Sequence, residues 1–182
     1  DPYLSRGLGD VYKRQADITR TFPVSGKFSD EQLAIYKVVL DAMNAAIDMV
    51  KPGNHIMQPQ EISEKVITEG LVKLGLLDGD PEELHKSGAY KEFYMHKIGH
   101  WLGLDVHDAG DYVEGEEYMK FKPGMITTIE PGIYISSSMD VDDKWKGIGI
   151  RIEDDILVTK DGNENLTKKV PSDPEEIESL MS

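Results

Sequence analysis

Apolar residues in the first half of the chain recur every three or four positions, which predicts helices. The clearest run begins after Ser29 and Gln32, which are spaced as a capping box. Its apolar positions are Leu33, Tyr36, Leu40, Met43, Ile47 and Val50. We therefore expect one amphipathic helix that ends where Pro52 and Gly53 begin a turn.

Three shorter stretches also have helical character. One opens at Pro59, where proline suits a first helical turn, and ends at a C-cap glycine, Gly75. Its apolar positions are Ile62, Val66, Ile67, Leu71 and Leu74. The others are short and acidic and cover residues 81–86 and residues 171–182.

The second half of the chain changes to a period of two, which predicts strands. Residues 125–130 follow a Pro-Gly turn, and residues 147–159 place isoleucine on one face and charged side chains on the other. Residues 160–163 indicate a hairpin turn that leads into residues 165–167. Helices followed by an antiparallel sheet predict the α+β class.

The beginning of the chain differs from the rest. Residues 1–15 have no clear period and end in a basic patch, so we interpret them as a leader before a domain that covers residues 16–182. The first segment of this domain, residues 16–24, predicts a strand whose pairing is limited by Pro23.

Composition narrows the classes of function. The chain has 182 residues, a net charge of −14 and no cysteine, which excludes disulfides, thiolate metal sites and a cysteine nucleophile. Such acidity argues against nucleic acid as a partner. The apolar stretches are too short for a transmembrane helix, and no signal peptide is recognisable. We therefore expect no membrane partner and a cytoplasmic location.

Carboxylates within strand patterns are the most informative polar residues. Asp17 begins the first predicted strand, Glu130 ends an apolar strand, and Glu153 lies among isoleucines. Burying such groups is costly unless a cation compensates their charge. Three histidines cluster within twelve residues, and they are His96, His100 and His107. Carboxylates that converge with one imidazole would suit Mn, Co, Fe or Zn.

Each of these residues also has an ordinary structural interpretation. A glutamate at a strand end is more often an exposed rim residue, and Arg151 beside Glu153 can form a simple ion pair. His96 and His100 are four residues apart, as in a zinc-binding helix, but Lys97 stands where that motif requires glutamate. The joint occurrence of the three carboxylates and the histidine cluster is what favours a metal site.

Four segments together resemble one known family. The segments DITRTFPVSGKF, HKIGHWLGLDVHD, ITTIEPGIYI and GIGIRIEDDILVT are similar to motifs of the Xaa-Pro aminopeptidase (aminopeptidase P) family of pita-bread metallopeptidases. The resemblance runs in the same order from about Ala16 to the end of the chain. Prolidase, which cleaves Xaa-Pro dipeptides, shares most of these motifs and is the main alternative.

The resemblance implies a pita-bread fold with a centre of two divalent metal ions, usually Mn²⁺. Asp17 matches the bridging aspartate, and His100 matches the imidazole ligand. Glu130 matches the terminal glutamate, and Glu153 matches the bridging glutamate. The implied function is a metal-dependent aminopeptidase that hydrolyses the bond between an N-terminal residue and a following proline through a metal-activated hydroxide.

The same resemblance implies roles for residues around the metals. His96 and His107 match histidines that contact the substrate and stabilise the tetrahedral intermediate, and Glu130 is the expected proton acceptor. Arg151 and Tyr134 match residues that orient the carboxylates. The implied partners are peptides with proline at the second position, and the full-length protein is expected to form homo-oligomers.

The chain departs from the family before Ala16. Counting back from Asp17 puts Arg6 at the family's first aspartate ligand, and Asp10 is out of place for it. We therefore expect the second metal site to lack its aspartate, the leader to be foreign, and residues 16–182 to be the C-terminal portion of an incomplete catalytic domain. Such a chain is expected to be aggregation-prone and weakly active or inactive. A catalytically dead peptide-binding module is the third hypothesis, and Arg6 favours it.

Overall fold

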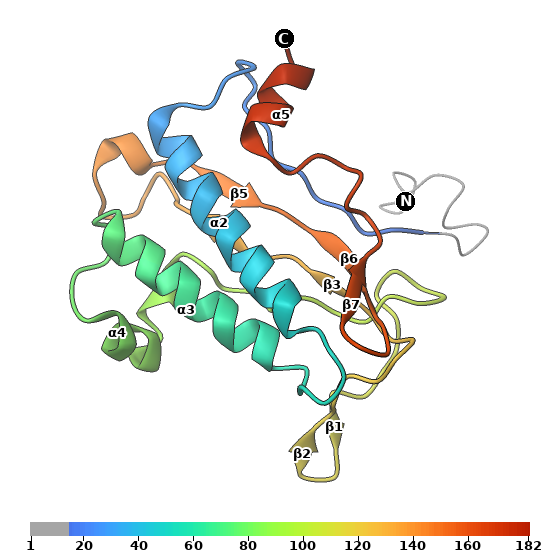
Figure 1. The fold of residues 1–182 in the computed structure, drawn as a ribbon. Helices are drawn as coiled ribbons and strands as arrows, with labels where there is room; N and C mark the ends of the chain where they lie inside the picture. Colours follow the sequence, from blue (N-terminus) through green and yellow to red (C-terminus); the bar gives the residue numbers. More distant parts are fainter. Residues whose placement is uncertain (1–14) are drawn as a thin grey trace.

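Two long helices lie side by side across the strands in the computed structural model, which describes residues 15–182 (Figure 1). Helix α2 spans Asp30–Met49 and α3 spans Gln58–Lys73. The predicted leader, including Arg6 and Asp10, falls almost wholly on residues 1–14, which lie outside the described part of the chain.

The other elements follow in chain order. They are α4 (Pro81–Ser87), η2 (Ala89–Glu92), β1 (Val113–Glu114), β2 (Glu117–Tyr118), β3 (Ile126–Ile129), β4 (Gly132–Tyr134), η3 (Asp143–Trp145), β5 (Gly149–Arg151), β6 (Asp154–Val158), β7 (Asn163–Asn165) and α5 (Pro174–Leu180). None of the helices in this described part is long and apolar enough to cross a membrane.

The first predicted helix is confirmed, including its capping box. The Ser29 hydroxyl accepts a hydrogen bond from the Gln32 backbone N–H, and the Gln32 side chain accepts one from the Ser29 N–H. The second helix begins one residue before Pro59 and ends two residues before Gly75. Gly75 has a φ of 74°, which suits the turn after the helix.

We define the helical layer as α2 and α3. The two helices bury their apolar faces against each other and against the strands. The fully buried side chains of α2 are Ile35, Tyr36, Val39, Ala42, Met43 and Ala46. Gly70 of α3 lies against Val38 of α2, so closely that a Cβ at position 70 would approach the Val38 Cγ1 to 2.4 Å. Helix α2 also contacts β3, β4 and β5, so this layer supports the strands from one side (Figure 1).

The strands form antiparallel pairs, as predicted. Strand β6 pairs with β3 on one side and with β7 on the other, and β4 pairs with β5. The β6–β7 hairpin confirms the turn signal of residues 160–163. The long strand predicted over residues 147–159 is divided in two, because Ile152 and Glu153 lie between β5 and β6.

The strand predicted in residues 16–24 is wrong in one respect. The segment is extended, but it forms only one backbone bridge, between Thr19 and Glu153. Two residues further along, the Thr21 hydroxyl donates to the Arg151 carbonyl (2.9 Å) and accepts from the Arg151 N–H (3.1 Å). Side-chain hydrogen bonds thus replace the regular ladder, so the antiparallel alignment persists without a formal strand.

Candidate metal centre

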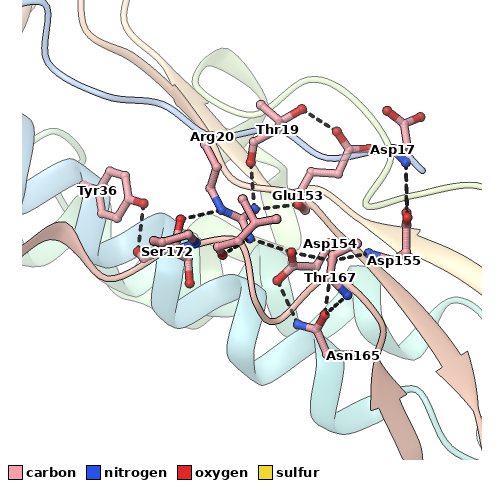
Figure 2. Close-up of polar contacts among 12 residues, drawn as sticks. Asp17, Thr19, Arg20, Tyr36, Glu153, Asp154, Asp155, Asn165, Thr167 and Ser172 are labelled. Carbon is pink, nitrogen blue, oxygen red and sulfur yellow. Dashed lines mark hydrogen bonds and ion pairs between the residues drawn. The ribbon is translucent and has the colours of Figure 1, made fainter. Parts of the chain in front are cut away.

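Residues 17–21 and the facing residues 151–155 form a line of polar contacts that we call the polar seam (Figure 2). At one end, the Asp17 N–H donates to the Asp155 carboxylate, 3.2 Å from Oδ2. The Thr19 hydroxyl donates to the Glu153 carboxylate. The seam therefore holds the acidic residues of two distant chain segments beside one another.

His100 is placed by the segment that runs along β3. The His100 carbonyl accepts from the Thr128 N–H (2.9 Å), and the His100 N–H donates to the Thr128 hydroxyl (3.0 Å). The preceding Gly99 has no room for a side chain, because a Cβ there would lie 1.9 Å from the Thr128 carbonyl oxygen. The His100 Nδ1 lies 3.0 Å from the Trp101 carbonyl, so Nδ1 carries the proton and Nε2 faces the carboxylates.

The His100 imidazole lies between two carboxylates. Its Nε2 is 3.3 Å from Oδ2 of Asp17 and 3.7 Å from Oε1 of Glu130. Glu130 directly follows β3, and its second oxygen, Oε2, lies 3.1 Å from Nη1 of Arg151. Arg151 thus partly compensates the charge of Glu130 at Oε2, while Oε1 faces the His100 imidazole.

The four predicted ligands come together in two overlapping groups. Donor atoms of His100, Glu130 and Glu153 lie within 4.8 Å of one another, and so do those of Asp17, His100 and His107. His100 belongs to both groups. The structure therefore places the three carboxylates around the His100 imidazole, with Asp17 on the His107 side.

Burial of the seam carboxylates changes their acidity. Glu153 is only 3% exposed, and burial, together with the negative charges of Glu130 and Asp17, raises its pKa from 4.5 to about 7. Burial likewise raises the pKa of Asp155 to about 6. Burial alone would lower the pKa of His100, but Asp17, the Trp101 carbonyl and Glu130 together raise it.

Three other predicted residues form a chain of hydrogen bonds next to Glu130. Arg151 Nε donates to the Tyr134 hydroxyl (2.8 Å), and that hydroxyl lies 2.8 Å from Nε2 of His96. The Nδ1 of His96 lies 2.9 Å from the Lys97 carbonyl. Burial lowers the pKa of His96, so its imidazole is neutral and accepts the Tyr134 proton at Nε2.

His107 lies at the solvent-exposed edge of the same site. Its ring meets that of His100 edge to face, with centroids 4.3 Å apart. The two histidines expected to contact substrate therefore differ: His107 is exposed to solvent, whereas His96 is half-buried and hydrogen-bonded to Tyr134.

The donor set fits a divalent cation. Three carboxylates and one imidazole nitrogen are hard or borderline ligands, and the Trp101 carbonyl orients the imidazole as metal-binding histidines require. The raised pKa of buried Glu153 indicates that protein cations alone leave its charge poorly compensated. Because metal ions bind deprotonated ligands, a cation and protons would compete for His100 and Glu153.

Sequence reasoning missed five polar residues of the seam, and these are Thr19, Arg20, Thr21, Asp154 and Asp155. A signal for two of them was present, since three successive carboxylates inside an apolar strand cannot all face solvent. Alternation places Glu153 and Asp155 on one face and Asp154 on the other. Both aspartates are 2% exposed. Arg20 contacts the carbonyls of Glu153 and Val170. Nothing in the sequence indicates that these two segments lie beside Arg20.

The described residues have the pita-bread fold, and they carry a group of donors that could hold a metal ion. Residues 8–160 match metallopeptidase family M24, and the chain belongs to that family. The α+β pita-bread class expected from the sequence is confirmed by the solved structures that resemble the chain.

Individual relatives are similar over nearly all of the chain. An Xaa-Pro aminopeptidase of Haemophilus influenzae is 51% identical over 166 residues, which make up 91% of this chain and 38% of that protein. Pseudomonas aeruginosa aminopeptidase PepP has a TM-score of 0.90 at 56% identity and is matched over 38% of its length. Zinc-substituted Escherichia coli aminopeptidase P in complex with product has a TM-score of 0.87 at 48% identity, with 91% of this chain and 37% of that one covered. The chain thus spans well under half the length of these relatives.

Proposed function

We propose that this chain carries the metal-binding part of an Xaa-Pro aminopeptidase, which releases an N-terminal residue that precedes proline. The observation that carries the proposal is the position of the His100 Nε2, 3.3 Å from Asp17 and 3.7 Å from Glu130, in a group that also includes Glu153. The name Xaa-Pro aminopeptidase, borne by relatives about half identical to the chain, supports the choice of substrate.

The residues that would hold the metal are Asp17, His100, Glu130 and Glu153. A bound divalent ion supplies a water of lowered pKa and a Lewis acid for the substrate carbonyl. Arg6 stands at the position that matches the family's first aspartate ligand, and it lies outside the described residues. We therefore propose that the second of the two metal sites lacks this ligand.

The surrounding side chains would perform the proton transfers and orient the peptide. Glu130 Oε1 faces the donor group and can accept a proton, because Arg151 already engages Oε2. His107, at the exposed edge, can donate to the oxygen of the scissile carbonyl as charge develops there. Neutral His96, oriented by Tyr134, would contact the substrate.

Several finer expectations are part of the same proposal. We propose Mn²⁺ as the native ion, peptides with proline at the second position as substrates, and a homo-oligomer as the form of the full-length protein. The cytoplasmic location expected from the sequence stays a prediction.

The proposal is tested by peptide cleavage with matched variants. The chain is incubated with Mn²⁺ and either a Gly-Pro dipeptide or a longer peptide with proline second, and released amines are measured. His100→Ala should abolish whatever weak cleavage this chain shows. The control is His85→Ala, since His85 lies 3.3 Å from Glu64 on a different part of the molecule and should be dispensable.

Each alternative predicts a different pattern. Cleavage of the dipeptide alone would favour prolidase and reject the proposed specificity. Binding of Mn²⁺ and of proline peptides without any cleavage would favour the dead peptide-binding module. Cleavage that persists unchanged in His100→Ala would place the activity elsewhere and contradict the proposed site.

A further inference from the structure

Behind the candidate metal centre, the guanidinium of Arg20 uses each of its five N–H groups. Nη1 donates to the carbonyls of Thr19 (2.9 Å) and Glu153 (2.7 Å). Nη2 and Nε donate to the remaining acceptors, which are Asp154 Oδ1 (2.7 Å), the Val170 carbonyl (2.8 Å) and the Pro171 carbonyl (2.7 Å). Figure 2 shows this side chain among Thr19, Glu153 and Asp154.

Nη1 holds the two residues whose backbone bridge joins the two sides of the polar seam. The Thr19 carbonyl also accepts from the Glu153 N–H (3.0 Å), and the Thr19 hydroxyl donates to the Glu153 carboxylate. A single nitrogen of Arg20 therefore fixes the main chain on both sides of the bridge. The Asp17 carboxylate, two residues before Thr19, depends on the same alignment.

Asp154 completes the arrangement from the face opposite to Glu153. Its Oδ1 accepts from Arg20 and from the Thr167 hydroxyl (2.7 Å), and its Oδ2 accepts from Asn165 Nδ2 (2.8 Å). The pair is largely buried, with side-chain exposures of 11% for Arg20 and 3% for Asp154. Strand alternation points Asp154 away from the donor group. The Arg20 guanidinium compensates the charge of the Asp154 carboxylate.

We propose that Arg20 is a positioning residue, which sets the spacing of the Asp17 and Glu153 carboxylates by fixing the backbone of Thr19 and Glu153. A buried ion pair is a weak source of net stability but a good source of fixed geometry. The proposal rests on the metal centre proposed above. It assigns Arg20 no contact with substrate or metal.

A lysine cannot replace Arg20 in this role. An ammonium has three donors at one point, whereas the guanidinium presents five donors in a planar fork. Arg20→Lys would keep the charge that pairs with Asp154 but would lose the simultaneous contacts to Thr19 and Glu153. We expect the Kd for Mn²⁺ to rise at least about 10-fold, the range found when partners that orient metal ligands are removed.

The matched control is Tyr36→Phe. The Tyr36 hydroxyl donates to the Ser172 carbonyl (2.9 Å) and so anchors the neighbouring C-terminal segment without touching the metal ligands (Figure 2). Its loss should lower the stability of the fold and leave the Kd for Mn²⁺ within about twofold of the wild type. The two variants therefore separate positioning from general stability.

Three readouts are collected on the wild type and both variants. Mn²⁺ binding is followed by calorimetric titration, and the geometry of the donor group is followed by the visible absorption of bound Co²⁺. Amide hydrogen exchange of the metal-free protein is measured at Glu153. We expect Arg20→Lys alone to weaken Mn²⁺ binding, alter the Co²⁺ spectrum and speed exchange at Glu153.

The outcomes that overturn the proposal are distinct. Unchanged Mn²⁺ affinity in a folded Arg20→Lys variant would reject it, and so would an equal loss in Tyr36→Phe. If Arg20→Lys does not fold, Asp154→Asn decides, because it loosens the guanidinium and should weaken Mn²⁺ binding about threefold or more; unchanged affinity there rejects the proposal. A wild type that binds no Mn²⁺ would remove the metal centre itself, and the positioning role with it.

Discussion

The helical layer and the polar seam are organised by opposite means. Helices α2 and α3 associate through buried apolar faces, and the close contact between Gly70 and Val38 needs no polar partner. The polar seam instead buries carboxylates of Glu153, Asp154 and Asp155, each 3% exposed or less. The layer gains free energy from apolar burial, whereas the seam needs cations and hydrogen bonds to compensate its buried charge. The layer therefore supplies stability, and the seam holds the buried carboxylates on which the proposed metal centre depends.

A change at Gly99 should have the largest effect, because it affects both stability and chemistry. In Gly99→Ala the new Cβ would lie 1.9 Å from the Thr128 carbonyl, and main chain cannot rotate away as a side chain can. We expect a loss of about 3 kcal/mol in unfolding free energy, together with displacement of His100. Urea denaturation measures the loss, and calorimetric titration with Mn²⁺ tests the displacement. Wild-type stability in this variant would show that the segment before His100 is adaptable.

Metal binding should stabilise the seam and, through it, the whole chain. At a free Mn²⁺ concentration 100 times its Kd, linkage predicts about 2.7 kcal/mol of added stability. For a chain of this length that corresponds to a rise in Tm of roughly 5–10 °C. Thermal unfolding with Mn²⁺ and with EDTA measures the difference, and His100→Ala provides the control. Equal melting temperatures would contradict a metal role for the seam.

Without metal, Glu153 should make stability depend on pH. Its pKa in the folded chain is raised to about 7 from 4.5, chiefly by burial, so the folded state disfavours the ionised form. Stability should therefore be highest below about pH 4.5 with respect to this group and fall as pH rises towards 7. Glu153→Gln should remove this fall and stabilise the metal-free chain at pH 8 by about 2 kcal/mol. Denaturation in EDTA at several pH values checks this, and a Glu153→Gln variant less stable than the wild type at pH 8 would oppose it.

The smallest expected effect belongs to the helical layer. Gly70→Ala gains roughly 1 kcal/mol in helix propensity but forces a Cβ to within 2.4 Å of Val38. Overpacking of this kind typically costs 1–3 kcal/mol, so we expect a net loss of about 1 kcal/mol. Mn²⁺ affinity should not change. A drop in Mn²⁺ affinity would show that the two regions are more tightly coupled than their contacts indicate.

The sequence predicted the helical layer well because its signals are local. The capping box at Ser29, the apolar period behind it and Pro59 at the start of α3 all lie within or beside the elements that they specify. The strand predicted at residues 16–24 failed in part because the partner segment lies more than a hundred residues away. Thr19 and Thr21 replace ladder hydrogen bonds there, and propensity does not reveal such pairing.

The candidate site was predicted in two steps. Carboxylates in strand patterns and a cluster of three histidines indicated a metal site, and the family resemblance then selected His100 as the imidazole ligand. The structure brings Asp17, His100, Glu130 and Glu153 into two groups that share His100. Arg20 carries no periodic signal, because its importance comes from carbonyls in three separate segments. Residues that act through several distant backbone groups are the ones that a single sequence conceals.

The most direct test of the account is the position of bound Mn²⁺ in a crystal of this chain, located by anomalous diffraction at the manganese edge. We predict a peak at bonding distance from His100 Nε2, with oxygens of Glu130 and Glu153, and of Asp17 on the His107 side, as its other ligands. A crystal equilibrated with Mn²⁺ that has no peak beside His100, or has its peak at a different part of the surface, would contradict the account.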